Sequence, residues 1–417
     1  MINQIKNKKV FVGMSGEVDS SVVAGLMKEQ GYDTVGVTMC FNISHPESKK
    51  ASCCGIDGIE DAKRAAHALD IPHYVFNFAE TIDEKIIDNF TDEYLAGRTP
   101  NPCVQCNKHL KFGSLFDKVR GLGADYLATG HYGKIEYSAA RECFELKKGV
   151  DKYKDQSYFL YSMDKATLPF VLFGLGGFTK YEVRDLARKY KLPNAEKPGS
   201  QDICFVPDSG YKKFIEDRVG KEALLPGAFK NEEGNIVGQH KGIPYYTIGQ
   251  RDGLGLALGR PVYVYKIDKE TNTVYIGGEE KLFSAGLIAE DVNFLSIDPP
   301  TPSQNGGSTR RSPTQKQLGE DGLASADFAE ELKAAELRAP LGHLKVKVKI
   351  RYNQPEMDAD LSVFEDGRVL ILFEKPQKSV TPGQSVVFYE GDIVLGGGII
   401  QSAITEESEH LASLKSQ

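Results

Sequence analysis

The feature that most constrains the fold is an alternation of strand and helix patterns over about the first 135 residues. Strands are predicted at Lys9–Val12, Thr34–Met39, His73–Phe78 and Asp125–Thr129, and helices at Ser20–Gln30, Gly58–Leu69, Thr81–Leu95 and Lys108–Gly121. This order predicts βαβ units and therefore an α/β domain with a doubly wound parallel sheet. Ligands of such sheets bind beyond the carboxyl ends of the strands, where Gly13, Met39 and the turn Thr129–Tyr132 fall.

A short Gly/Ser-rich segment joins the first strand to the first helix and predicts a phosphate site. It comprises Gly13, Met14, Ser15, Gly16, Glu17, Val18, Asp19 and Ser20. Backbone N–H groups of such a turn, together with the helix N-terminus, bind phosphate oxygens. The Gly-Lys-Ser/Thr ending of a Walker loop is absent. The segment instead resembles the Ser-Gly-Gly-x-Asp-Ser loop of ATP-pyrophosphatases, with Glu17 in the place of one glycine.

After the α/β pattern, the predicted secondary structure changes twice along the chain. From about residue 165 it reads as helices, including a capping box at Thr179–Glu182, and from about residue 225 as short strands typical of small barrels. We therefore predict an α/β domain over 1–164, a small helical central domain over 165–223 carrying Cys204, a β-rich segment over 224–290, and a C-terminal β-barrel over 291–417. Residues 299–340 begin with linker composition and are predicted to be a mobile insertion.

Length, composition and charge limit the classes of protein to which the chain can belong. A chain of 417 residues is too long for one ordinary core, and 41% hydrophobic with 26% charged residues is typical of a globular protein. No apolar run is long enough to cross a membrane and no signal-peptide core is seen, so we expect a cytoplasmic protein with reduced thiols and no membrane partner. The net charge of −7 argues against a non-specific nucleic-acid coat protein, but allows a basic face of limited size.

Three cysteines stand out from the seven. Cys103 and Cys106 form a C-x-x-C pair in a proline-bound loop, and Cys204 lies in a long Gly/Pro loop that could swing toward them. We place Cys106 just before the helix expected from Lys108, where the helix N-terminus, Lys108 and Arg98 would favour a thiolate. For a C-x-x-C pair in such a loop, metal or cluster ligation, redox chemistry and nucleophilic attack are all favoured over packing in the core. The remaining cysteines are expected to be small buried side chains, and the adjacent Cys53-Cys54 pair receives no assigned role.

Several motifs in a fixed order resemble the tRNA-specific 2-thiouridylase (MnmA or TrmU) family of the ATP-pyrophosphatase superfamily. Besides the phosphate loop, they are Arg98–Lys108, Ala128–Tyr132, Lys154–Leu160, Ile203–Phe205, Tyr246–Gly255, Thr381–Tyr389 and Leu395–Ile400. The resemblance spans nearly the whole chain except residues 299–339. It implies an adenine nucleotide α-hydrolase-like N-terminal domain, a small central domain and a C-terminal β-barrel.

The resemblance also implies a reaction. ATP adenylates the C2 oxygen of the wobble uridine in the anticodon loop of tRNA, pyrophosphate leaves, and sulfur then replaces the activated oxygen. An amide-like oxygen leaves poorly and AMP leaves well, so activation followed by thiol chemistry is physically sound. The sulfur would come from a cysteine desulfurase, directly or through relay proteins.

Site roles follow from matching positions. Cys106 matches the catalytic nucleophile and Cys204 the persulfide carrier, while Gly13–Ser20 would hold ATP with Asp19 near Mg²⁺. Met39 and Gly130 would border the nucleotide. Asn101, Pro102 and Cys103 would face the target base, which must leave its stack. The implied tRNA contacts are His131, Lys154, Asp155, Gln156, Arg351, Tyr352 and Gln384.

Two residues depart from the commonest family pattern. Many members have Asp at the position of Cys103 and others have Cys, so Cys103, Cys106 and Cys204 could ligate a [4Fe–4S] cluster with one open iron. That chemistry competes with the persulfide and alternating-disulfide route, and the sequence leaves both open. Glu17 would repel a phosphate by roughly 4 kcal/mol at about 4 Å and a dielectric of ~20, unless it turns outward or helps to bind Mg²⁺. It predicts weaker ATP binding than in a Glu17→Gly variant.

Two other functions remain as rivals. Another pyrophosphatase-loop ligase would need no cysteine trio. A tRNA-binding protein whose nucleotide site is impaired by Glu17 would bind tRNA without releasing AMP or pyrophosphate.

Overall fold

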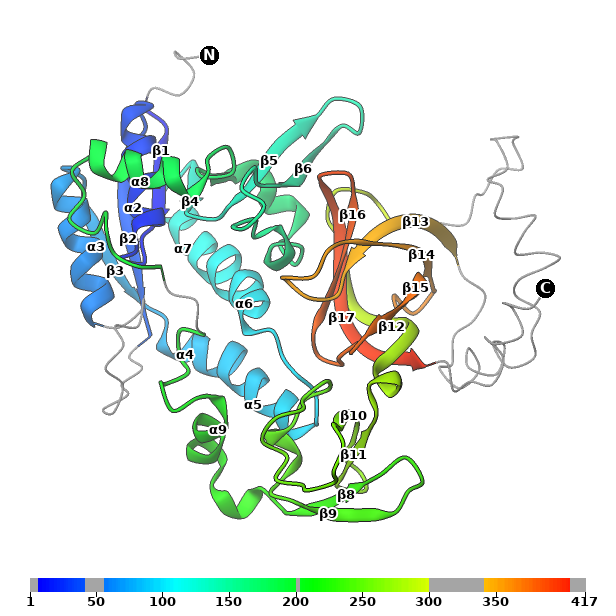
Figure 1. Cartoon of the computed structure of the whole chain (residues 1–417). Helices are drawn as coiled ribbons and strands as arrows, with labels where there is room; N and C mark the ends of the chain where they lie inside the picture. The colour runs from blue at the N-terminus through cyan, green and yellow to red at the C-terminus, as the bar shows by residue number, and fades with distance from the viewer. Residues whose placement is uncertain (1–6, 42–55, 200–202, 300–340, 406–417) are drawn as a thin grey trace, which may run out of the picture.

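The computed structural model describes residues 7–41, 56–199, 203–299 and 341–405 (Figure 1). The Cys53-Cys54 pair and residues 300–340 of the predicted insertion lie outside the described residues. Within the described ranges, no helix reaches the length and apolar character that a membrane crossing requires.

The N-terminal part is built on a five-stranded parallel sheet of order β3-β2-β1-β4-β7. Its strands are β1 (Lys9–Gly13), β2 (Asp33–Cys40), β3 (His73–Asn77), β4 (Tyr126–Thr129) and β7 (Val171–Phe173). The four strands predicted from the sequence and their parallel arrangement are confirmed. The fifth, β7, was not predicted because three residues are too short to show a period.

Helices flank this sheet, as the alternating pattern predicted (Figure 1). They are α2 (Val18–Glu29), α3 (Ile56–Ala68), a continuous helix of α4 (Ala79–Ile82), η1 (Asp83–Ile87) and α5 (Asp88–Leu95), and a second one of α6 (Pro102–Gln105), η2 (Cys106–Leu115) and α7 (Phe116–Gly121). The apolar face of α2 is buried, with Val22 and Val23 fully enclosed.

Helix α8 (Lys180–Lys189) packs against α2 and begins with the predicted capping box. The two helices approach closely at Gly25, where a Cβ atom would lie 2.6 Å from the ring of Tyr190. The sheet and its helical cover therefore continue past residue 164 through β7 and α8.

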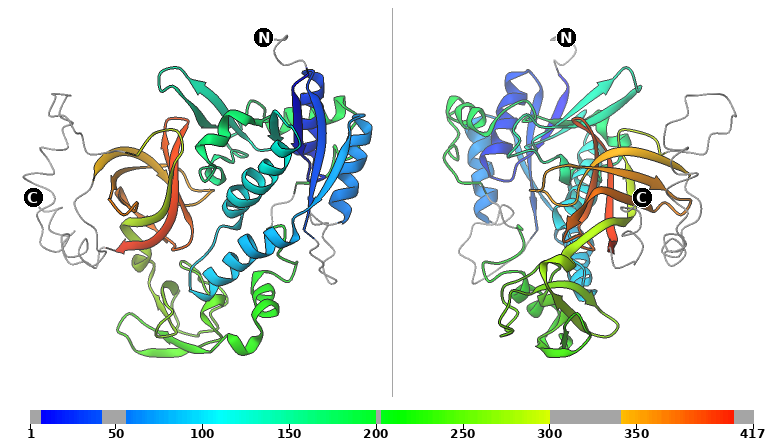
Figure 2. Two further views of the ribbon diagram at one scale, coloured as in Figure 1. Left: turned by 180° about the vertical axis from the view of Figure 1, so that it is seen from behind. Right: turned by 45° about the vertical axis from the view of Figure 1, so that its right-hand side comes forward.

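Two β regions follow α9 (Tyr211–Val219). A four-stranded sheet contains β8 (Gly227–Lys230), β9 (Ile236–His240), β10 (Tyr263–Asp268) and β11 (Thr273–Gly277). The C-terminal barrel contains β12 (Phe283–Phe294), β13 (Gly342–Lys349), β14 (Met357–Val363), β15 (Val369–Lys378), β16 (Ser385–Glu390) and β17 (Ile393–Thr405), and pairing of β12 with β17 closes it (Figure 2). The predicted C-terminal barrel is thus confirmed.

A hairpin from the N-terminal part joins this barrel. Its strands are β5 (Gly133–Ser138) and β6 (Cys143–Lys148), and β6 pairs with the beginning of β17. Short 3₁₀ helices occupy Ser157–Phe159, Lys165–Phe170, Lys221–Ala223, Ile243–Tyr245 and Glu279–Leu282. Hairpins connect β10 with β11 and β14 with β15.

Candidate active site

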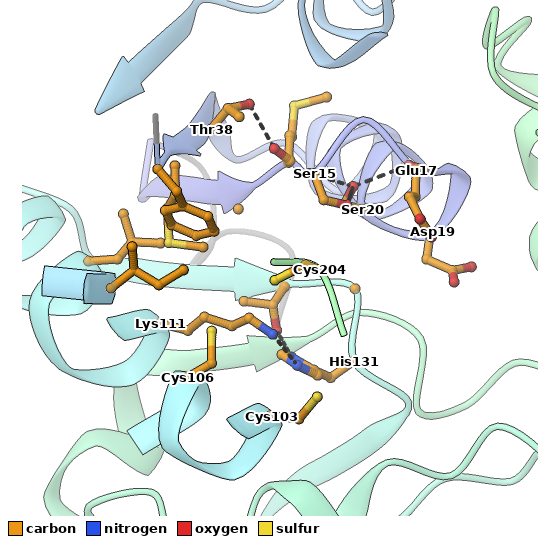
Figure 3. Close-up of a pocket in the computed structure, with 18 of the residues that line it drawn as sticks. Ser15, Glu17, Asp19, Ser20, Thr38, Cys103, Cys106, Lys111, His131 and Cys204 are labelled. Carbon is orange, nitrogen blue, oxygen red and sulfur yellow. Dashed lines mark hydrogen bonds between the residues drawn. The ribbon is translucent and has the colours of Figure 1, made fainter. Parts of the chain in front are cut away.

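A cavity of about 310 Å³ lies beyond the carboxyl ends of β1, β2 and β4, where the fold class predicts a ligand site (Figure 3). One wall is the predicted nucleotide loop and the other carries the cysteines. Of the predicted site residues, those lining it are Gly13, Met14, Ser15, Glu17, Asp19, Ser20, Met39, Pro102, Cys103, Cys106, Gly130, His131, Gln156 and Cys204. Six separate stretches of sequence, at residues 13–20, 39, 102–106, 130–131, 156 and 204, therefore meet in one cavity.

The other predicted residues lie outside its lining. Gly16 and Val18 are buried within the loop, while Asn101, Lys154, Asp155, Arg351, Tyr352 and Gln384 lie elsewhere. Asp155 accepts hydrogen bonds from the N–H of Gly149 and from Ser157, and Arg351 donates to the carbonyl oxygen of Ser379. These contacts give several of them roles within the chain, and their contact with tRNA remains a prediction.

The phosphate loop is shaped by its own side chains. The Ser20 hydroxyl accepts the N–H of Ser15 at 3.1 Å and donates to the carbonyl oxygen of Glu17 at 3.2 Å. Thr38 on β2 donates to the carbonyl oxygen of Met14 at 2.7 Å. The loop conformation is therefore set by short-range contacts and one neighbouring strand.

The glycine that this loop requires is Gly16, not residue 17. Gly16 has φ +81°, and a Cβ atom there would lie 2.2 Å from the carbonyl oxygen of Gly58. Glu17, just before α2, has φ −91° and ψ 163°, an extended conformation open to any residue. Position 17 therefore does not require glycine for its backbone conformation, and the predicted effect of Glu17 on ATP binding rests on its charged side chain.

The helix that carries the cysteines starts earlier than predicted. It begins at Pro102, with the Asn101 side chain accepting the N–H of Val104 at 3.4 Å, so the predicted start near Lys108 is wrong. The physical reason is the Asn-Pro pair, which supplies an N-cap followed by a first-turn proline. The N-terminal turn therefore holds Cys103, and Cys106 lies one turn further on.

The cations expected to act on Cys106 are engaged elsewhere. Arg98 bonds Glu93 at 2.7 Å and Glu290 at 2.8 Å, and Lys108 bonds Asp291 at 2.7 Å. Neither side chain lines the cavity, and their predicted role beside the thiol stays a prediction.

A cation that sequence reasoning missed, Lys111, lines the cavity with Cys106. Both belong to the wide helix η2, in which residues five apart lie one above the other (Figure 3). The sequence holds no readable signal for such a π-helical stretch.

Lys111 is oriented by His131. Its ammonium can only donate, so the Nε2 atom of His131, 3.2 Å away, accepts and the Nδ1–H donates to Thr129 at 2.7 Å. Complete burial, with the positive charge of Lys111, holds the pKa of His131 well below its ordinary value. A neutral imidazole thus fixes a cation in the cavity wall.

The segment before the cysteines is held by both β regions. The Thr99 N–H donates to the carbonyl oxygen of Pro382 at 2.8 Å, and the Gln384 amide donates to the carbonyl oxygens of Thr99 and Pro100 at 3.0 and 3.1 Å. The hydroxyls of Thr99 and Thr247 also bond each other. The barrel and the four-stranded region therefore position the cysteine loop.

Cys204 approaches from a third segment that is tied to the phosphate loop. Upstream of it, the Asn194 amide donates to the carbonyl oxygen of Gly16 and to the Ser21 hydroxyl, each at 3.0 Å. In Figure 3 the thiols of Cys103 and Cys106 point from the helix toward the side of the cavity where Cys204 lies. Nevertheless, across the described ranges no three Cys, His, Asp or Glu side chains are grouped closely enough to hold a metal ion. The ligands of one ion lie closer together than the thiolates that hold a [4Fe–4S] cluster, so ligation of a cluster by the three thiols stays a prediction.

Comparisons with known proteins agree over nearly the whole chain. Three family models match: the tRNA methyl transferase HUP domain at residues 8–208, the tRNA methyl transferase PRC-barrel domain at 212–278, and the aminomethyltransferase beta-barrel domain at 329–400. Proteins named tRNA-specific 2-thiouridylase MnmA from Acetivibrio thermocellus and Carboxydothermus hydrogenoformans are each 45% identical to this chain. The alignments cover 95% and 96% of this chain and 100% and 99% of those proteins.

Among solved structures, the U34-tRNA thiolase NcsA from Methanococcus maripaludis with its [4Fe–4S] cluster aligns with 53% of this chain and 70% of its own length. The identity is 19% and the TM-score 0.30, so nothing is concluded from it.

Proposed function

Because the chain belongs to the tRNA-specific 2-thiouridylase MnmA family, we propose that it replaces the C2 oxygen of the wobble uridine in tRNA by sulfur at the expense of ATP. The observation that carries this proposal is the cavity that a phosphate loop and three thiols line together. A ligase without sulfur chemistry has no use for the thiols, and a simple RNA-binding module has no use for either wall.

The loop side would carry out activation. The backbone from Gly13 to Ser20 and the N-terminus of α2 bind the phosphates, and Asp19, which lines the cavity, would hold Mg²⁺. The C2 oxygen of the base bonds to the α-phosphorus as the bond to the β-phosphate oxygen breaks, and the N3 proton leaves. Pyrophosphate departs, and the base carries a good leaving group.

The cysteine side would carry out transfer. A desulfurase loads Cys204 as a persulfide, whose terminal sulfur attacks C2 while AMP leaves. The Cys106 thiolate, favoured by the Lys111 ammonium in the same wall, then attacks Sγ of Cys204. A Cys106–Cys204 disulfide forms, the transferred sulfur stays on C2, and N3 regains a proton. A thiol reductant supplies the two electrons that restore both cysteines.

Cys103 is exposed and follows Asn101 and Pro102 directly, the other residues expected to face the base, so we assign it to the base rather than to a cluster. Iron and sulfide analysis of anaerobically purified protein tests this directly. We expect full activity without stoichiometric iron. If the wild type contains iron, and Cys103→Ala loses both the iron and the activity, the reaction uses a cluster and not the persulfide route.

Mass spectrometry of tRNA nucleosides tests the function itself. A strain lacking its own 2-thiouridylase is compared with and without this chain, and with Cys143→Ser, whose thiol contacts the carbonyl oxygen of Ser296 away from the cavity. We expect 2-thiouridine to return with both forms. Its absence, with tRNA still bound, would indicate a binding protein, and ATP cleavage without thiolation or need of the cysteines would indicate another ligase.

A further inference from the structure

The least explained contact of the cavity is an ion pair at the phosphate loop. Lys180, the first residue of α8, places its ammonium 2.5 Å from Oδ1 of Asp19. Both side chains are largely enclosed, with 18% of Lys180 and 24% of Asp19 exposed. Lys180 lies far along the chain from the loop, and the sequence drew attention to it only as a position within the capping box Thr179–Glu182.

The same carboxylate has a second partner. The Tyr132 hydroxyl donates to Oδ1 of Asp19 at 2.9 Å, and the Lys180 ammonium lies 5.9 Å from the centre of the Tyr132 ring. A phenol hydroxyl is neutral at ordinary pH, so this group remains a donor. Asp19 is therefore held by a neutral donor even when the lysine leaves.

The negative charge of the loop wall gives Lys180 a reason to move from Asp19 to a bound ligand. Glu17 and Asp19 both line the cavity, and among its described lining residues Lys111 is the only Lys or Arg and lies beside the cysteines. A pyrophosphate group brings further negative charge to this wall. Lys180 is the cation that contacts the wall from just outside, on a flexible stem with a compact charge suited to phosphate.

We propose that Lys180 is a pyrophosphate ligand that exchanges partners: it neutralises Asp19 in the empty site and moves to the β- and γ-phosphate oxygens when nucleotide binds. Asp19, still held by Tyr132, then becomes available to Mg²⁺. This inference rests on the proposed function, since it assigns a role within the same nucleotide site.

Calorimetry with inorganic pyrophosphate, ATP and AMP in the presence of Mg²⁺ tests the exchange. We expect Lys180→Gln to bind pyrophosphate and ATP at least ten-fold more weakly and AMP unchanged, and Lys180→Arg to stay within about three-fold of the wild type. Lys189→Gln, on the same helix but paired with Glu29 at the surface, is the matched control and should bind as the wild type does. Equal pyrophosphate affinity in Lys180→Gln, or an equal loss for AMP, would overturn the proposal.

A second comparison covers the case in which Lys180→Gln does not fold because Asp19 is left with an uncompensated charge. Asp19→Asn and Asp19→Asn/Lys180→Gln both lack the ion pair, so neither leaves a buried carboxylate unpaired. Without Mg²⁺ we expect the double variant to bind pyrophosphate at least ten-fold more weakly than Asp19→Asn, and equal binding would contradict the role of Lys180. Failure of the wild type to bind ATP or pyrophosphate at all would instead contradict the proposed function.

Discussion

The phosphate loop and the cysteine loop face one cavity, but they are held in different ways. Ser15, Ser20 and the backbone of residue 17 bond one another within a few positions of the chain. The Arg98–Pro100 segment instead bonds Glu290, Pro382 and Gln384, more than 180 residues away. The phosphate loop is therefore shaped largely by local contacts, to which Asn194 and Lys180 add contacts from later in the chain, whereas the segment before the cysteines is held largely by residues of the barrel side.

The largest effect that separates the two walls is expected from Gly16→Ala. Its Cβ atom would meet the Gly58 carbonyl oxygen at 2.2 Å in a conformation that already costs about 1–3 kcal/mol for a residue other than glycine. We expect ATP binding, measured by calorimetry, to fall more than ten-fold. Gly31→Ala is the control, because Gly31 also has positive φ but its Cβ atom would meet nothing within 4 Å. If both variants bind ATP normally, the loop geometry described here is wrong.

The opposite wall is tested by Gln384→Ala. The substitution removes two hydrogen bonds to the cysteine loop, and small displacements near reacting atoms cost up to about 100-fold in rate. We expect kcat for thiolation to fall about ten-fold while ATP binding is unchanged, and Gln377→Ala, on the same barrel, to be neutral. A raised KM for tRNA at constant kcat would show that Gln384 contacts tRNA, as the sequence predicted, and does not position the loop.

Substitutions of Glu17 separate the effect of side-chain charge from that of backbone conformation in the phosphate loop. Since the backbone of Glu17 is extended, we expect Glu17→Gln and Glu17→Gly to tighten ATP binding equally, by about five-fold or roughly 1 kcal/mol, through loss of the negative charge. Calorimetry of both variants decides the matter. Tighter binding by the glycine variant alone would restore a backbone role for this position.

The smallest effect concerns His131. Its pKa is lowered in the folded protein, so the unfolded chain binds the proton more readily and stability falls as the pH drops below about 6.5. One such group contributes a slope of about 1.4 kcal/mol per pH unit. Urea unfolding at several pH values between 6.5 and 5 gives the free energy of unfolding as a function of pH. The slope of that plot should be smaller in His131→Gln than in the wild type, by the equivalent of about one bound proton. An unchanged slope would mean that His131 titrates normally.

The contrast between the walls also explains what the sequence could predict. Strands, helices and the loop of the N-terminal sheet follow from local periodicity, and so did the gathering of residues 13, 39 and 130 at strand ends. The helix start at Pro102 was within reach, because Asn101 and Pro102 are the residues preferred at an N-cap and the first helical position. The π-helical spacing of Cys106 and Lys111 was not, because several windings suit the same residues. The sequence could not predict that Lys180 and Gln384 contact these loops, because their contacts arise only from tertiary packing.

The most direct test of the two-walled site measures pyrophosphate release and 2-thiouridine in the same reaction with Cys204→Ser. The loop wall should still activate the uridine, so we expect tRNA-dependent pyrophosphate release without 2-thiouridine, while Cys143→Ser gives both products. Loss of pyrophosphate release in a folded Cys204→Ser protein that still binds ATP and tRNA would contradict the division of labour between the walls. Formation of 2-thiouridine by this variant would contradict the role of Cys204 as the sulfur carrier.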